Sequence, residues 1–122
     1  MKYTRVFADE EGETHFEDVE VELELVDFAP PASPLMLSRF KPATRYAFCM
    51  FPSGWFGDWH PTPRKQFFFG LSGEYEVKVS DGKSRVFGPG SVVLVEDVAG
   101  KGHVTRVVGS EGVLTAIVQL ED

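Results

Sequence analysis

The sequence predicts an all-β protein. The chain has 122 residues, and its 12 glycines and 8 prolines divide it into many short segments. No stretch has the three-to-four-residue apolar spacing of a long helix. Several segments instead alternate apolar and polar residues, which is the period of a half-exposed strand. The length predicts one domain covering residues 1–122.

The first third of the sequence predicts strands followed by a loop. Residues 3–7 form a candidate first strand, and an acidic turn at 9–13 ends it. Residues 19–25 place valine and leucine on one face and glutamate on the other, so we expect a half-exposed strand there. Pro30, Pro31 and Pro34 then predict a loop that crosses between two sheets. Residues 1–34 are therefore expected to form N-terminal strands and a crossover loop.

The remainder, residues 35–122, is expected to form the core of a β-barrel. Residues 74–80 should point Tyr75, Val77 and Val79 inward, and Asp81-Gly82 predicts a tight hairpin turn that needs a positive φ. Residues 91–95 have no polar face, so this strand should be buried on both sides. Further strands are predicted at 35–40, 44–51, 66–71, 83–87, 103–108 and 113–120. Nine or ten short strands indicate a closed or double-sheet barrel.

Composition and charge argue against several classes of partner. The formal net charge of −7 disfavours nucleic-acid binding, which needs a basic surface. No apolar run is long enough to span a membrane. The single Cys49 cannot form an internal disulfide, and no export signal begins the chain, so we expect a cytoplasmic protein.

Two stretches of the sequence carry recognisable motifs. The first runs from His60 through Thr62 and Gln66 to Gly73, and the second contains Phe87-Gly88-Pro89-Gly90, the apolar strand at 91–95 and then His103. Together they resemble the two signature motifs of the cupin superfamily. The resemblance implies a cupin-type double-stranded β-helix, which is a jelly-roll barrel. In the cupin pattern, histidine and glutamate stand where this chain has Thr62 and Gln66, so two of four expected metal ligands are replaced.

The resemblance implies a binding pocket inside the barrel, lined by His60, Thr62, Gln66 and His103. On one strand, positions 60, 62 and 66 have the same parity and share a face, unless Pro61 and Pro63 impose a bulge. Trp59, Phe68 and Thr105 are expected nearby as further ligand contacts.

A metal site at these positions would use His60, Gln66 and His103. Zinc, iron, manganese or nickel would be the candidate ions, but stable sites of this kind normally have three good donors, often including an anion. Replacement of the carboxylate by Gln66 removes that negative charge. We therefore expect weak or absent metal, unless Asp58, Glu96 or Asp97 supplies a carboxylate.

These residues admit more than one function. The leading interpretation is a protein that binds a small molecule in its barrel. The alternative is an enzyme: a metal-dependent dioxygenase, decarboxylase or isomerase, or a metal-free isomerase or epimerase. In a metal-free enzyme, His60 and His103 are the candidate catalytic residues, acting as acid and base near neutral pH. A purely structural role for His60, hydrogen-bonded at the barrel mouth, also stays open.

Three consecutive phenylalanines predict an oligomer. Phe67, Phe68 and Phe69 make both faces of their strand apolar, so one face fills the barrel and the other needs a cover. Cupins that this chain resembles commonly pair through strands of that kind. We expect a homodimer.

Overall fold

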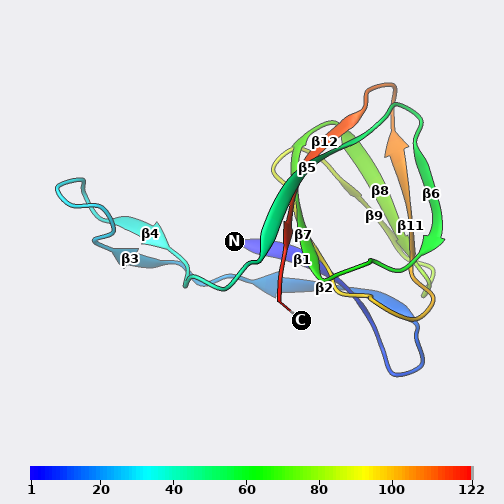
Figure 1. Ribbon diagram of the computed structural model, residues 1–122, viewed down its shortest axis with the longest axis horizontal. Coiled ribbons are helices and arrows are strands. Elements are labelled where there is room, and N and C mark those ends of the chain that lie inside the picture. Colours follow the sequence, from blue (N-terminus) through cyan, green and yellow to red (C-terminus); the bar gives the residue numbers. More distant parts are fainter. Residues whose placement is uncertain (122) are drawn as a thin grey trace.

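The computed structural model describes residues 1–121, and this part of the chain is built entirely of strands and connecting loops (Figure 1). The all-β prediction is therefore confirmed. Within residues 1–121 no helix is long and apolar enough to cross a membrane. The twelve strands of this region are β1 (Lys2–Ala8), β2 (Thr14–Glu20), β3 (Glu24–Val26), β4 (Leu35–Leu37), β5 (Arg45–Phe51), β6 (Phe56–His60), β7 (Gln66–Ser72), β8 (Glu74–Val79), β9 (Ser84–Phe87), β10 (Val92–Val95), β11 (His103–Val108) and β12 (Val113–Gln119).

Ten of these strands form two sheets that face each other as a jelly-roll barrel (Figure 1). The six-stranded sheet has the order β2-β1-β10-β7-β12-β5, and the four-stranded sheet has the order β6-β11-β8-β9. β1 pairs with β10 in parallel, and the other ladders are antiparallel. The predicted barrel is confirmed, and its two sheets enclose the core.

The core consists of apolar side chains from the inner faces of both sheets. Tyr75, Val77 and Val79 on β8 point inward as their alternation predicts. Each buried aliphatic side chain of this kind stabilises the fold by roughly 1.5–3 kcal/mol. The remaining buried members of the cluster are Val6, Phe87, Val93, Val95, Val107 and Val113.

Two further local predictions are confirmed. β10 is buried on both faces, since Val93, Leu94 and Val95 are all inaccessible. The Asp81-Gly82 turn joins β8 to β9, and Gly82 adopts the positive φ of 96° that this tight turn needs.

The strand predicted at residues 19–25 is wrong as one element. β2 ends at Glu20, β3 begins at Glu24, and residues 21–23 belong to neither strand. The ladder with β1 ends at Glu20, so the chain beyond it has no neighbouring strand there. Alternation of side chains predicts faces, but a strand also needs a partner for its backbone.

The proline-rich segment was also placed wrongly. Pro30, Pro31 and Pro34 lie in the turn between β3 and β4, which pair as a two-stranded hairpin. The segment that contains this hairpin, residues 21–44, connects two strands of the same sheet, β2 and β5, rather than crossing between sheets. It projects away from the barrel (Figure 1), and we call it the arm. The predicted count of nine or ten strands was low, chiefly because β2 and β6 were not recognised.

The three phenylalanines of β7 divide between the two faces of the sheet. Phe68 points inward and packs near Phe51, with ring centroids 6.2 Å apart. Phe67 and Phe69 share the outer face, with centroids 5.5 Å apart. The outer face of the six-stranded sheet is therefore apolar around β7.

Candidate functional site

Two of the three histidines lie side by side at one end of the barrel. β6 and β11 are antiparallel neighbours, and their register places His60 opposite His103. The ring centroids are 4.6 Å apart. His103 is buried, whereas His60 on the edge strand is half-buried. The predicted pairing of two imidazoles is thus present in the structure.

Gly102 makes this close approach possible. It has a φ of 75°, and a Cβ at this position would lie 2.4 Å from both the carbonyl carbon and the oxygen of His60. Only glycine fits without displacing the neighbouring backbone. The chain therefore passes directly beside His60 before His103 opens β11.

A buried carboxylate holds the ring of His103. Oδ2 of Asp97 lies 2.6 Å from Nδ1 of His103, and the Asp97 side chain is 0% exposed. Oδ1 of Asp97 has no hydrogen-bond partner among the described residues. Since an ionised carboxylate only accepts, Nδ1 of His103 carries the proton in this contact. Asp97 thus fixes both the tautomer and the orientation of the ring.

His60 is held in the corresponding way by the backbone. Its Nδ1 lies 2.6 Å from the carbonyl oxygen of Asp58. A carbonyl oxygen cannot donate, so Nδ1 of His60 must be the donor. When both rings are neutral, the Nε2 atoms of His60 and His103 carry lone pairs, and within residues 1–121 neither makes a hydrogen bond. The pair therefore has two ring nitrogens that no other described residue engages.

Thr62 and Gln66 form a second polar cluster. The Gln66 amide donates to Oγ1 of Thr62 at 3.3 Å, and its Oε1 accepts from Nε2 of Gln119 at 2.9 Å. Thr62 donates in turn to the carbonyl oxygen of Arg64 at 2.7 Å. The hydrogen-bonding groups of Gln66 are therefore largely occupied by the protein. Gln119, which also accepts from Arg45, was not recognised in the sequence because its partners depend on the register of β12.

The two clusters lie on opposite sheets and meet through a loop contact. The backbone N–H of Thr62 donates to the carbonyl oxygen of Asp97 at 3.1 Å. β6 ends at His60 and β7 begins at Gln66, so residues 60, 62 and 66 are not on one strand. The parity argument does not apply across this break. His60 and Gln66 still face the barrel interior, each from its own sheet.

The three other predicted contact residues lie at different depths. Trp59 precedes His60 on β6, points to the opposite face and is 46% exposed, so it does not join the histidine pair. Phe68 belongs to the apolar core. Thr105 is buried on the same face of β11 as His103, two residues further along the strand.

The donor set does not fit a three-donor metal site. Among residues 1–121, no three histidine, cysteine, aspartate or glutamate side chains cluster so that they could hold an ion. Asp97 contacts Nδ1 of His103, and so orients the ring rather than adding a ligand. Glu96 pairs with Arg5 and Lys65, and Asp58 accepts from the backbone N–H of Trp59. The remaining donors are the imidazoles of His60 and His103 and the Gln66 amide, which is already hydrogen-bonded to Thr62 and Gln119.

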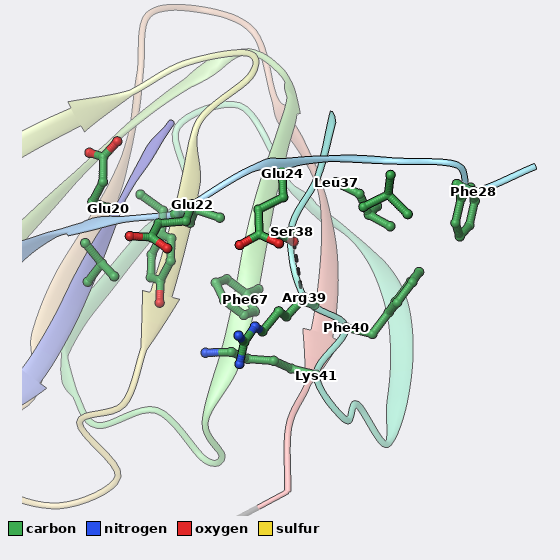
Figure 2. Close-up of a pocket in the computed structure, with 14 residues that line it drawn as sticks. Glu20, Glu22, Glu24, Phe28, Leu37, Ser38, Arg39, Phe40, Lys41 and Phe67 are labelled. Atoms are coloured by element: carbon green, nitrogen blue, oxygen red, sulfur yellow. Dashed lines mark hydrogen bonds between the residues drawn. The ribbon is translucent and has the colours of Figure 1, made fainter. Parts of the chain in front are cut away.

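Two surface hollows of the described part of the chain lie elsewhere. A groove of about 640 Å³ runs between the root of the arm and the barrel (Figure 2). It is lined by Tyr3 and Phe67 of the barrel and by Phe28 and Phe40 of the arm, among others. A second hollow of about 450 Å³ lies between the β1–β2 turn and the loop before β11. Neither is lined by His60, Thr62, Gln66 or His103.

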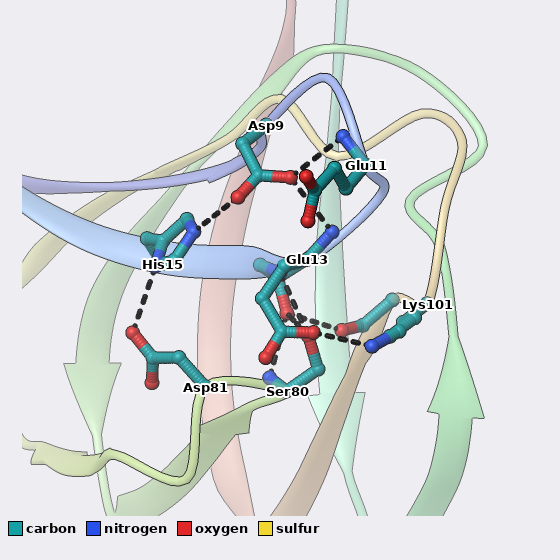
Figure 3. Close-up of polar contacts among 9 residues, drawn as sticks. Asp9, Glu11, Glu13, His15, Ser80, Asp81 and Lys101 are labelled. Carbon is teal, nitrogen blue, oxygen red and sulfur yellow. Dashed lines mark hydrogen bonds and ion pairs between the residues drawn. The ribbon is translucent and has the colours of Figure 1, made fainter.

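The third histidine, His15, has a structural setting (Figure 3). Its Nε2 lies 2.7 Å from Oδ2 of Asp9, and its Nδ1 lies 2.9 Å from Oδ2 of Asp81. These two hydrogen bonds raise the pKa of His15, because both ring nitrogens can donate only in the protonated form. His15 thus links the β1–β2 turn to the β8–β9 turn.

Comparison with known proteins supports the fold. No family model and no curated protein matches the chain. Among solved structures, the cupin domain of Cnp3 from Schizosaccharomyces pombe aligns with a TM-score of 0.53 at 13% identity, covering 99% of this chain and 88% of that one. The chain has a cupin fold.

Two other solved structures also align with this chain. A putative ethanolamine utilization protein Q from Salmonella typhimurium LT2 is 14% identical, with a TM-score of 0.49 and coverage of 98% of this chain and 95% of that one. Protein NMB1881 from Neisseria meningitidis is 17% identical, with a TM-score of 0.45 and coverage of 62% and 72%. With TM-scores below 0.5, neither of these two structures bears on the fold or the function of this chain.

Proposed function

We propose that this barrel binds a small, hydroxyl-bearing molecule at the end of the barrel where β6 ends and β11 begins. We expect little or no metal there. The observation that carries the proposal is the His60–His103 pair, in which each Nδ1 is engaged by the protein and each Nε2 is left for a ligand. Two neighbouring acceptors suit a molecule with adjacent hydroxyl groups.

Gln66 and Thr62 have a different role from the two histidines in this proposal. Gln66 and Thr62 already satisfy each other and their other partners, so they shape and stiffen the barrel mouth. Polar groups held by a surrounding hydrogen-bond network are well placed to orient a ligand without moving on binding. The histidines are then the groups that contact the ligand.

Nitrogen NMR of the imidazole rings tests the proposal. In ¹⁵N-labelled protein at a pH where the rings are neutral, His60 and His103 should both be protonated at Nδ1. Titration with glucose, sorbitol and malate, which represent sugars, polyols and hydroxy acids, should shift both Nε2 signals along a saturating curve with at least one probe. His15 is the internal control and should not move.

Two results would contradict the proposal. Protonation of either ring at Nε2 would show that its lone pair is not presented to a ligand. Titrations in which no probe moves the His60 and His103 signals, or in which His15 moves equally, would exclude specific binding of hydroxylated molecules. A His103→Ala variant should abolish the shift of His60.

A second candidate function is metal-free acid–base catalysis by the same pair. The buried Asp97–His103 contact favours it, because a carboxylate on Nδ1 orients an imidazole for proton transfer through Nε2. An isomerase or epimerase of this kind takes a proton from carbon onto a neutral imidazole, and a protonated imidazole then returns a proton to carbon. In D₂O, an aldose should then gain deuterium beside its carbonyl group, and His103→Ala should stop the exchange. Absence of exchange in the wild-type protein would exclude this activity for aldoses.

A further inference from the structure

The arm lacks a core of its own. It contains a hairpin with three paired positions between β3 and β4, and a two-stranded hairpin alone is at best marginally stable in water. Phe28 and Phe40 contact each other at 5.9 Å between centroids, yet both remain exposed. The other exposed apolar side chains of the arm are Leu23, Leu25, Leu35 and Met36. Such a segment needs an apolar surface to pack against.

The barrel has an apolar surface of matching character. β5 is an edge strand of the six-stranded sheet, and its outward side chains Tyr46, Phe48 and Met50 are 76%, 70% and 56% exposed. Their register partners on β12 are apolar too: Val118, Ala116 and Leu114. Phe67 and Phe69 of β7 continue this surface. We call these eight side chains the outer face.

The arm approaches the outer face of its own barrel at Phe67 and leaves Tyr46, Phe48 and Met50 exposed. It leaves at the end of β2, returns at the start of β5 and points away from the sheets (Figure 1). We propose that two copies of the chain form a dimer in which the arm of each copy packs on the outer face of the other. This assigns segments to the expected homodimer and does not depend on the proposed ligand.

The charges at the root of the arm suit a second copy of the same chain. The groove has an acidic wall with Glu20, Glu22 and Glu24, and it carries Arg39 and Lys41 on the other wall (Figure 2). In a two-fold dimer, a surface that holds both signs can meet itself with opposite charges facing. This matching offsets the repulsion expected between two chains that each have a net charge of −7.

The exposed apolar area is sufficient for a stable dimer. Taking about 200 Å² for a whole aromatic side chain, Phe28, Phe40, Tyr46 and Phe48 together expose on the order of 500 Å². Two copies double this figure, and the leucines and methionines add to it. Stable interfaces bury roughly 1,200–2,000 Å² in total. A monomer would leave an apolar surface larger than soluble proteins normally expose.

Mass measurement by light scattering tests whether the dimer forms through these segments. The wild-type protein should have twice the mass of the 13.6 kDa chain at micromolar concentration. Phe48→Glu, which alters the outer face, and the double change Leu25→Glu with Met36→Glu, which alters the arm, should each give the single-chain mass. Val86→Glu, an exposed valine on β9, is the matched control and should remain a dimer. Circular dichroism checks that each variant is folded. If Phe48→Glu unfolds, Tyr46→Glu replaces it as the outer-face variant; if the double arm variant unfolds, Phe40→Glu replaces it.

Mixing the two monomeric variants identifies which segments meet. The arm of the Phe48→Glu chain is intact, and so is the outer face of the arm variant, so the mixture should recover dimers with one of each chain. Pairing of face with face, or of arm with arm, would give no such recovery. A monomeric wild-type protein, a dimer that survives both changes, or a mixture that stays monomeric would each overturn the proposal.

Discussion

Asp97 and His103 form a buried contact between a carboxylate and an imidazole at the barrel mouth. Oδ2 and Nδ1 are 2.6 Å apart, and His103 Nδ1 makes its hydrogen bond to this carboxylate. The backbone of Asp97 also accepts from Thr62, so one loop residue supports both polar clusters. The position of His103 therefore depends on the loop between β10 and β11 as much as on its own strand.

Removal of the Asp97 carboxylate should destabilise the protein. Asp97→Ala leaves the buried Nδ1–H of His103 without an acceptor, and this should lower the free energy of unfolding by about 1–3 kcal/mol. Asp97→Asn retains an acceptor oxygen and should cost less. Urea unfolding followed by tryptophan fluorescence measures both, since Trp55 stacks on Phe51 beside the core. Equal losses would show that the acceptor is not what stabilises His103.

A Gly102→Ala substitution should disturb the histidine pair. The added Cβ would collide with the carbonyl group of His60, in addition to the cost of a positive φ. Gly109→Ala is the matched control, because Gly109 has a φ of 80° but nothing within 4 Å of a Cβ. The free energy of unfolding of the control should fall by roughly 1–2 kcal/mol because of the strained backbone alone. That of Gly102→Ala should fall clearly further. Only Gly102→Ala should shift the NMR signals of the His60 and His103 rings. If both variants lose the same free energy of unfolding and the ring signals do not move, Gly102 does not position the histidine pair.

The stabilising contribution of His15 should depend on pH. Its pKa is raised in the folded protein by Asp9 and Asp81, so its contribution is complete below its unfolded pKa of about 6.5 and is lost as the pH rises through the folded value. The pKa of Asp9 is lowered, chiefly by the hydrogen bond with His15. That contribution is present above the unfolded pKa of Asp9 and is lost as the pH falls through its lowered value.

Urea unfolding of the wild-type protein and a His15→Gln variant should follow this pattern. The wild type should be the more stable of the two in mildly acid solution, and the difference should shrink as the pH passes neutrality. A difference that stays constant from acid to alkaline pH would show that protonation of His15 does not stabilise the two turns.

The extent to which the sequence predicts the structure varies with the type of feature. β8, β10 and the Asp81-Gly82 turn were predicted because side-chain alternation, continuous apolarity and turn chemistry are local properties. The break at residues 21–23 was missed because it depends on where the neighbouring strand ends.

The candidate site was predicted only in part, because some of its contacts depend on residues that are far apart in the sequence. The resemblance to the cupin motifs implies that His60 and His103 share a pocket, and the structure places their rings side by side. The contacts of Asp97 with His103, and of Gln119 with Gln66, join residues through a loop conformation and a strand register. No local pattern in the sequence encodes either.

Restoring the cupin ligand pattern should create a metal site. In a Thr62→His and Gln66→Glu double variant, a third imidazole and a carboxylate are added to the His60–His103 pair, and zinc prefers such a donor set. Zinc binding measured by calorimetry should rise to about one ion per chain, and a further His60→Ala change should remove it. Failure to gain zinc in a folded double variant would show that positions 62 and 66 do not converge with the histidines.

Metal content is the most direct test of the central proposal, which is that this barrel works with its histidine pair and without a tightly bound ion. Protein purified without tags, added metal or chelator should contain zinc, iron, manganese and nickel well below one ion per chain by mass spectrometry. His60→Ala and His103→Ala should leave that amount unchanged. Near-stoichiometric metal in the wild-type protein that disappears in both variants would contradict the claim and make metal-dependent catalysis the leading function.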